Sequence, residues 1–326
     1  MQAQGTERIA FLGGGHMARA LIGGLLRERI APAQIRVGEP RAEAREALAG
    51  ELGVEVSPDN RHALAGATLV VLAVKPQDAT CALQALYASG SAAPSAGAGA
   101  AAQPPVLLSI AAGLTIAQLA RASPPGTPIV RAMPNRPALL GAGITGLYVP
   151  PQTPPRARAL AELIGRAAGR AVWLRTEDEL DVVTALSGSG PAYFFLLAER
   201  LARAAQALGL PADTAELLAA ETLYGAGVLA HQVAAAGPGA ASLAQERRAV
   251  TSRGGTTAAA LQVLEEGGFD ALIARALQAA AARAAQLAAG TGMPAAAAPE
   301  DAGHGSAPSG TREATPASVY GPGHRL

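Results

Sequence analysis

The sequence has few of the residues on which several common classes of function depend. Its single cysteine, Cys81, excludes an intramolecular disulfide and a cysteine-rich zinc site. The 26 lysine and arginine residues nearly balance 25 aspartate and glutamate residues, so the net charge of +1 cannot hold nucleic acid or an anionic membrane. The polar start, 1–7, lacks a secretory signal, and no uninterrupted apolar stretch has membrane-spanning length. These absences predict a soluble, cytoplasmic protein without a metal site.

Half of the residues are apolar, and the chain is about twice the length of a common domain, which predicts two domains. In the first half, short apolar runs alternate with segments of helical periodicity. We expect strands at Ile9–Leu12, Ile35–Val37, Leu69–Val74, Val106–Ile110, Ile129–Ala132, Ile144–Val149 and Ala171–Leu174. We expect helices at Met17–Leu26, Ala42–Leu52, Asp78–Tyr87, Ile116–Arg121 and 156–168. The alternation predicts an α/β fold: a parallel sheet covered by helices on both faces.

The second half differs in composition. From Glu177 onward, alanine and leucine recur at helical spacing, with breaks expected at Gly188–Pro191, 237–239 and 254–255. The sequence therefore predicts a Rossmann-type sheet domain over 1–175 and an all-helical domain over 176–290. Two low-complexity segments lack apolar periodicity, and we expect 88–105 to be a mobile loop and 291–326 a disordered tail.

A glycine-rich segment directly follows the first predicted strand and opens the first predicted helix. It reads Gly13-Gly14-Gly15-His16-Met17-Ala18, which fits the dinucleotide fingerprint G-x-G-x-x-G/A in the required context. Gly13 would allow a tight turn, Gly15 would let the pyrophosphate approach the backbone, and the helix N-terminus would supply partial positive charge. The simpler alternative is that these glycines only end a strand.

The choice between NADH and NADPH stays open at this point. Glu39 ends the second predicted strand, where an acid accepts a hydrogen bond from the ribose of NAD and repels the extra phosphate of NADP. Arg41, two residues later, favours the phosphate. Both residues could also be ordinary surface charges. Lys75, the only lysine, follows the strand that ends in Val74 and is either a ligand contact or a surface residue.

Two segments of the helical half contain hydroxyls and glycines at predicted helix starts. Ser187-Gly188-Ser189-Gly190-Pro191 precedes a long apolar helix, with Pro191 suited to its first turn. The run 251–257 reads TSRGGTT and leads into another helix. Free amides and hydroxyls at such a start can bind a small carboxylate, although plain helix capping would explain either segment.

Several of these motifs occur together, in order, in one known family. The motifs are FLGGGHMARALI, AVKPQ, RAMPNRPALLGAGITGLY, DVVTALSGSGPAYFFLLAERL and TSRGGTTAAALQVLEEGGF. Over about residues 8–289 the chain resembles pyrroline-5-carboxylate reductase, the enzyme of the last step of proline biosynthesis. The resemblance implies a Rossmann domain, a helical domain that forms a homodimer or a larger homo-oligomer, and hydride transfer from NADP(H), with NAD(H) as the alternative.

The resemblance also implies roles for individual residues. Cofactor contacts fall on Leu12, Gly13, Gly14, Gly15, His16, Met17, Asn60, Ala73, Val74, Lys75, Pro76, Ala111 and Ala112, with Glu39 beside the adenosine phosphate. Substrate contacts fall on Ser252, Gly254, Gly255, Thr256 and Thr257, with Ser187 and Ser189 as weaker candidates. The chain departs from the family pattern at His16, Glu39 and Arg253. Glu39 puts the NADP preference in question, and Arg253 could adjust the affinity for carboxylate.

The reaction implied by the resemblance needs mainly positioning, because a protonated imine accepts hydride directly. We expect the amides of 255–257 to hold the substrate carboxylate and the Thr257 hydroxyl to orient the ring nitrogen. One alternative is reduction of another cyclic imine or of a β-hydroxy acid carbonyl, although the latter would suit a lysine base that the helical half lacks. A second alternative is a catalytically inactive protein that senses dinucleotides. In such a protein we would expect the hydroxyl residues of the 251–257 loop to be lost.

Overall fold

The computed structural model of the chain describes residues 7–87, 104–237 and 241–289. The predicted mobile loop over 88–105 falls largely outside these residues, and the predicted tail over 291–326 falls wholly outside them.

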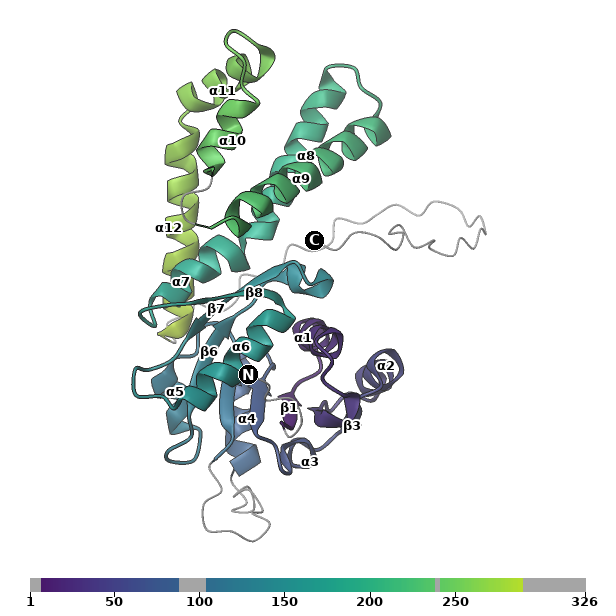
Figure 1. Ribbon diagram of the computed structural model, residues 1–326, viewed down its shortest axis with the longest axis vertical. Helices are drawn as coiled ribbons and strands as arrows, with labels where there is room; N and C mark the ends of the chain where they lie inside the picture. Colours follow the sequence, from purple (N-terminus) through teal and green to yellow (C-terminus); the bar gives the residue numbers. More distant parts are fainter. Residues whose placement is uncertain (1–6, 88–103, 238–240, 290–326) are drawn as a thin grey trace, which may run out of the picture. The chain divides into compact units, whose positions relative to one another are not determined.

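The first half forms one eight-stranded sheet with the strand order β3-β2-β1-β4-β5-β6-β7-β8 (Figure 1). The strands are β1 (Ile9–Leu12), β2 (Ile35–Gly38), β3 (Glu55–Ser57), β4 (Leu69–Leu72), β5 (Val106–Ser109), β6 (Ile129–Met133), β7 (Gly143–Tyr148) and β8 (Gly169–Trp173). All neighbouring strands are parallel except β6 and β7, which pair antiparallel. The expected parallel sheet is thus confirmed for most of its width.

Two details differ from the sequence expectation. Strand β7 runs antiparallel because only residues 134–142, with the short helix η2 (Arg136–Leu140), connect it to β6. A parallel return needs a crossover of a dozen or more residues. The three-residue edge strand β3 was not predicted, because it is partly exposed and has no apolar run. The short helix α3 (Asn60–Leu64), which follows β3, was not predicted either.

Helices cover both faces of the sheet and form a separate core on each face. They are α1 (His16–Arg27), α2 (Ala42–Leu52), α3, α4 (Pro76–Tyr87), α5 (Ile116–Arg121) and α6 (Pro155–Ala167), with η1 (Pro32–Gln34) before β2. One core joins α1, α2 and α6 to side chains such as Phe11 and Val71. The other joins α3, α4 and α5 to the alternate side chains Leu12 and Leu72. Apolar residues on both faces of each central strand require this arrangement.

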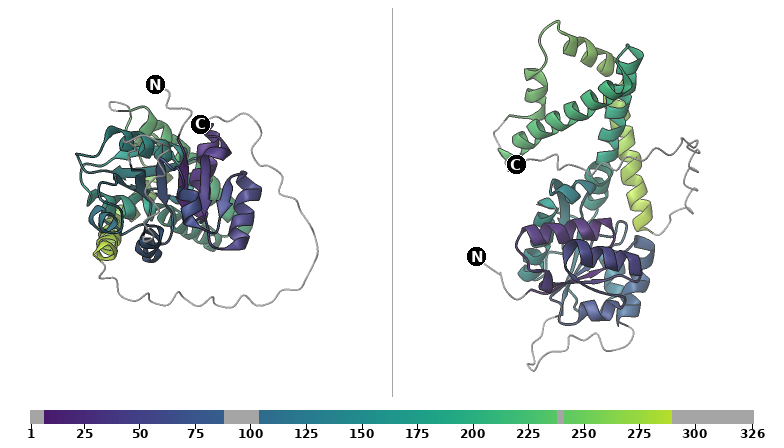
Figure 2. Two further views of the ribbon diagram at one scale, coloured as in Figure 1. Left: turned by 90° about the horizontal axis from the view of Figure 1, so that it is seen from below. Right: turned by 90° about the vertical axis from the view of Figure 1, so that its right-hand side faces the viewer.

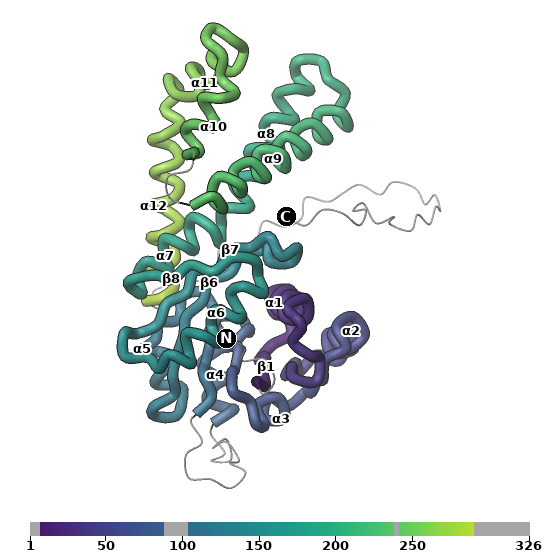
Figure 3. The backbone as a smooth tube through the Cα atoms, in the orientation of Figure 1, coloured from purple at the N-terminus to yellow at the C-terminus, as the bar shows by residue number. Residues whose placement is uncertain are grey.

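The described residues beyond β8 form no strand, as the sequence predicted (Figure 3). They form α7 (Glu179–Val183), the π-helical turn η3 (Thr184–Gly188), α8 (Gly190–Ala207), α9 (Ala212–Ala235), α10 (Leu243–Ala249), α11 (Thr256–Glu266) and α12 (Phe269–Ala288). Many large apolar side chains of this half are exposed, including Phe194, Phe195 and Leu201 of α8. This helical half therefore has little core of its own within one chain.

The predicted break at Gly188–Pro191 is wrong in one respect. Pro191 does lie in the first turn of α8, but the preceding residues are helical as well, so that α7, η3 and α8 make one helical stretch. The helix continues through the glycines as a π-turn, in which the Ser189 amide donates to the Thr184 carbonyl, five residues earlier, at 2.9 Å. By length and composition alone this stretch, Glu179–Ala207, is apolar enough to cross a membrane, and 17% of its most apolar window is buried.

The end of α12 returns to the sheet domain. The Gln118 side chain of α5 donates to the Ala288 carbonyl at 3.0 Å. Figure 2 shows this end of α12, in yellow-green, beside the sheet domain. The first and last helices of the helical half, α7 and α12, also contact each other.

Candidate dinucleotide and substrate site

The carboxyl ends of the parallel strands meet at one edge of the sheet. Leu12, the last residue of β1, is in register with Gly38 of β2 and Leu72 of β4, and Leu72 is in register with Ser109 of β5. The chain order reverses beside β1, which is where open α/β sheets bind ligands. The predicted cofactor residues lie at or just after the ends of β1, β2, β4 and β5, at positions 12–17, 39, 73–76 and 111–112, and Asn60 begins the helix α3 that follows β3. The fold therefore brings this predicted set together.

The glycine loop between β1 and α1 has the geometry of a phosphate-binding turn. Gly13 has a φ of +96°, and a Cβ there would lie 2.9 Å from the Ala73 carbonyl oxygen, so only glycine fits. Gly15 caps α1, and a Cβ there would meet nothing within 4 Å. The amides of the first turn of α1 have no acceptor within the helix, and the space beside Gly15 is open. His16 lies exposed at this helix start, and Met17 is partly buried.

The Glu39 side chain is hydrogen-bonded to the glycine loop. Its side chain is only 5% exposed, and its Oε2 accepts from the Gly14 amide at 2.9 Å. Its Oε1 accepts from the Arg41 amide at 3.1 Å and from Arg41 Nε at 2.9 Å. Burial alone would raise the pKa of Glu39, but these hydrogen bonds from Arg41 and Gly14 outweigh burial and lower it. The ionised carboxylate therefore holds Gly14 and is neutralised by Arg41.

The other predicted cofactor residues surround this loop. Asn60 begins α3 and lies against the end of β2, since a Cβ on Gly38 would lie 2.0 Å from Asn60 Oδ1. Lys75, just before α4, and Pro76, the first residue of α4, are exposed, and Ala73 and Val74 before them are partly buried. Ala111 is buried and Ala112 is partly buried after β5.

The predicted substrate loop is the turn between α10 and α11. Gly254 has a φ of +71°, and Gly255 caps α11 while its amide donates to the Ser252 carbonyl at 3.1 Å. Thr256 and Thr257 begin the helix, so their amides have no acceptor within it. Ser252, Arg253, Gly254 and Thr256 are exposed, and Gly255 and Thr257 are partly exposed. The loop thus has the free amides and hydroxyls that a carboxylate requires.

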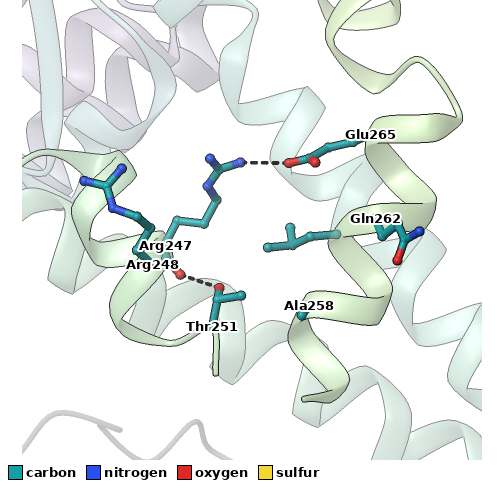
Figure 4. A pocket seen from close by; sticks show the side chains of 7 residues that line it. Arg247, Arg248, Thr251, Ala258, Gln262 and Glu265 are labelled. Atoms are coloured by element: carbon teal, nitrogen blue, oxygen red, sulfur yellow. Dashed lines mark hydrogen bonds and ion pairs between the residues drawn. The ribbon is translucent and has the colours of Figure 1, made fainter. Parts of the chain in front are cut away.

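The two helices that flank this loop are held together on one side. Arg247 of α10 makes an ion pair of 3.3 Å with Glu265 of α11, and the Thr251 hydroxyl donates to the Arg247 carbonyl at 2.6 Å. Figure 4 shows a hollow between these helices, lined by Arg247, Arg248, Thr251, Ala258, Leu261, Gln262 and Glu265. The ion pair thus connects α10 to α11, and the Thr251 bond closes the end of α10.

Ser187 and Ser189, the weaker substrate candidates, lie in and just after the π-turn. The Ser187 hydroxyl donates to the Val183 carbonyl at 3.0 Å, and its own carbonyl accepts from Asn135 Nδ2 at 3.1 Å. Among the hydrogen bonds and ion pairs of the described residues, none joins the 252–257 loop to the π-turn or to the glycine loop. The structure therefore presents three separate groups of predicted site residues.

Sequence reasoning missed a polar cluster at the junction of the two halves. Arg131 of β6 is 7% exposed and donates to Glu177 at 2.9 Å, and the same carboxylate oxygen accepts from the Ile116 amide at 2.7 Å. Burial raises the pKa of nearby Asp181, an effect that Arg131 opposes and Asp178 and Glu177 reinforce. No local pattern marks these residues, because 46 positions separate Arg131 from Glu177.

Two family models match the chain. A model of pyrroline-5-carboxylate reductase dimerisation matches residues 177–287, and a model of NADP oxidoreductase, coenzyme F420-dependent, matches residues 8–95. A curated pyrroline-5-carboxylate reductase from Pseudomonas aeruginosa is 42% identical over 283 residues, which cover 87% of this chain and 97% of that protein. The chain belongs to the pyrroline-5-carboxylate reductase family.

Other members of the family agree with this. The pyrroline-5-carboxylate reductase of Mycobacterium tuberculosis is 40% identical over 298 residues and covers 87% of this chain and 97% of its own. The solved structure of such a reductase from Coxiella burnetii has a TM-score of 0.77 at 37% identity and covers 87% of this chain and 99% of its own. Relatives of this family match nearly their whole length, so the Rossmann-type sheet and the helical half are both family features.

Proposed function

We propose that the protein reduces the C=N bond of 1-pyrroline-5-carboxylate to L-proline by hydride transfer from NAD(P)H, the last step of proline biosynthesis. The observation that carries this proposal is the 42% identity to a curated reductase over 87% of the chain. The site geometry supports it, because the helices α1 and α11 both begin at glycine-containing turns and leave amides there without an acceptor in the helix.

The residues at the sheet edge fit a nicotinamide dinucleotide. The space beside Gly15 and the free amides of α1 would receive the diphosphate, and the residues after β4 and β5 would flank the nicotinamide half. When bound, the cofactor supplies the hydride. We infer that the remaining residues of the predicted cofactor set line this site.

The substrate loop would position the imine. We infer that the amides of Thr256 and Thr257 hold the carboxylate of the substrate, because the Gly255 amide, which was predicted to join them, already donates to the Ser252 carbonyl. Thr257 Oγ1 would accept a hydrogen bond from the protonated ring nitrogen. Ser187 and Ser189 form a separate group within one chain, so we infer that they line the same pocket only in the homodimer, where the loop of one chain would meet the π-turn of the other. The iminium carbon gains hydride, the C=N π electrons become the nitrogen lone pair, and the nitrogen keeps its proton. Positioning then provides most of the rate enhancement, and no side-chain acid is needed in the hydride step.

The finer cofactor preference follows from Glu39 and Arg41. We infer that the enzyme accepts NADPH as well as NADH, because Arg41 neutralises the carboxylate that would otherwise repel the extra phosphate. The Arg41 side chain is 71% exposed and could contact that phosphate. Replacing Arg41 with alanine should lower kcat/KM for NADPH by about tenfold more than for NADH. An unchanged ratio would contradict this preference.

The helical half would form a homodimer, which could assemble further. We divide the chain into a nucleotide-binding domain (1–175) and a helical domain (176–290), and the dimerisation model that matches 177–287 supports this division. A second copy would cover exposed apolar side chains such as Phe194 and Phe195. We infer a cytoplasmic enzyme, in which this interface would account for the apolar character of Glu179–Ala207.

One experiment tests the function directly. Oxidation of NADPH and of NADH should each be followed in the presence of pyrroline-5-carboxylate, with cofactor alone as the control and proline measured as the product. A cyclic imine without a carboxylate should react poorly, because the loop amides would have no anion to bind. Equal rates with both imines would contradict the role given to the 252–257 loop.

A further inference from the structure

Asn135 joins the sheet domain to the π-turn. It lies between β6 and η2 and is only 8% exposed. Its side-chain oxygen accepts from the Ile144 amide of β7 at 2.9 Å, while its side-chain nitrogen donates to the Ser187 carbonyl at 3.1 Å. Both ends of the amide are therefore used, one in each half of the chain.

The Ser187 carbonyl needs this donor for a reason that the sequence explains. In an α-helix, a carbonyl accepts from the amide four residues later. For Ser187 that residue is Pro191, which has no amide hydrogen. The amide five residues later, which would be the donor in a π-helix, belongs to Ala192 and donates to the Ser189 carbonyl at 3.0 Å. A partly buried carbonyl without a donor is unfavourable, so another group must supply the hydrogen bond. Asn135 Nδ2 supplies it.

The packing around the π-turn leaves little freedom for another arrangement. A Cβ on Gly188 would lie 2.7 Å from Cε of Met133, the last residue of β6. A Cβ on Gly146 of β7 would lie 2.9 Å from the Val183 side chain. Glycine at both positions lets the helical stretch lie close to the strands, within reach of the short Asn135 side chain.

We propose that Asn135 is a positioning residue that provides the donor missing at Pro191 and thereby fixes the π-turn in the geometry that binds the substrate. The inference rests on the proposed function, in which Ser187 and Ser189 line the substrate pocket. It predicts that the hydrogen bond matters for the imine substrate and not for the dinucleotide.

The experiment compares Asn135→Asp in two backgrounds at a pH of about 8, where a free carboxyl is ionised. Aspartate keeps the size of asparagine and the acceptor for Ile144 but has no donor for Ser187. We expect kcat/KM for pyrroline-5-carboxylate to fall by about tenfold or more, with the calorimetric dissociation constant of NADPH within about twofold. In a Pro191→Ala background, residue 191 has an amide hydrogen, and the same change should cost less than about threefold.

The outcomes separate the alternatives. Equal losses in both backgrounds, a loss below about threefold in the original background, or an equal loss of NADPH affinity would each overturn the inference. If Asn135→Asp is insoluble, recovery of soluble, active enzyme with Pro191→Ala supports it, and failure to recover contradicts it. Inactivity of the unaltered protein toward pyrroline-5-carboxylate would contradict the proposed function, whereas equal losses in an active protein contradict only this inference.

Discussion

Replacing Glu39 with glutamine tests whether this residue holds the glycine loop. Glutamine has the same size but only one acceptor oxygen, so its NH₂ group must face either the Gly14 amide or the Arg41 donors. At least one hydrogen bond to a charged acceptor is lost, and such a bond contributes about 1.5–3 kcal/mol. Because the Arg41 side chain is 71% exposed, solvent screens its ion pair with Glu39, and that pair adds little to stability.

We therefore expect the free energy of unfolding to fall by about 1.5–3 kcal/mol near neutral pH, measured by chemical denaturation at a fixed protein concentration. The loss should depend on pH. The pKa of Glu39 is lowered in the folded protein, so its stabilisation is complete above the unfolded pKa of about 4.3 and disappears as the pH falls through the lower folded pKa. The difference between the two proteins should shrink across that window.

A matched control is Glu46→Gln, at an exposed position of the neighbouring helix α2, which should change stability by less than about 0.5 kcal/mol. The preference for NADPH over NADH should rise in Glu39→Gln, because a negative charge near the extra phosphate is removed. A destabilisation below about 0.5 kcal/mol, or one that stays the same at acidic pH, would refute the role of Glu39 as the partner of Gly14.

Four further predictions concern the loops and the helical half. Thr257→Val should lower kcat/KM for pyrroline-5-carboxylate by about 10- to 150-fold with little change in cofactor affinity, and a loss below about threefold would mean that Thr257 only begins a helix. Gly15→Val should fold normally, since a Cβ there meets no atom within 4 Å, but should bind cofactor at least about tenfold more weakly in calorimetry. In contrast, Gly14→Ala should lower the melting temperature, because its Cβ would lie 2.3 Å from the Leu48 side chain, and an unchanged value would contradict the packing described. Light scattering at micromolar concentration should detect a dimer, and an active monomer would contradict the assignment of the apolar helix faces.

Much of the architecture was predictable from local patterns. Buried strands such as IAFL and LVVL are continuous apolar runs, and the intervening helices have apolar residues on one side, so the order of strands and helices could be read along the chain. The glycine loop was also predictable, because its position between a strand and a helix constrains both its conformation and its ligand. The family motifs then indicated the reaction.

Other features depend on residues that are far apart in sequence. The antiparallel direction of β7 follows from a short connection whose path the sequence does not reveal, and the edge strand β3 exists only because β2 offers it hydrogen-bonding partners. The helical continuity through Ser187–Pro191 was likewise hidden, since glycine and proline there look like a break. A π-turn removes that conflict once the strands behind it are in place.

The sequence by itself determined most of the helices and strands and the chemistry that the loops offer, because those properties depend on neighbours within a few residues. Only the tertiary structure decided how the polar groups pair. Glu39 meets the Gly14 amide across 25 positions, and Asn135 meets the Ser187 carbonyl across 52. Such pairs form when packing excludes water from a donor and an acceptor that the fold has brought together, and no local pattern encodes that proximity.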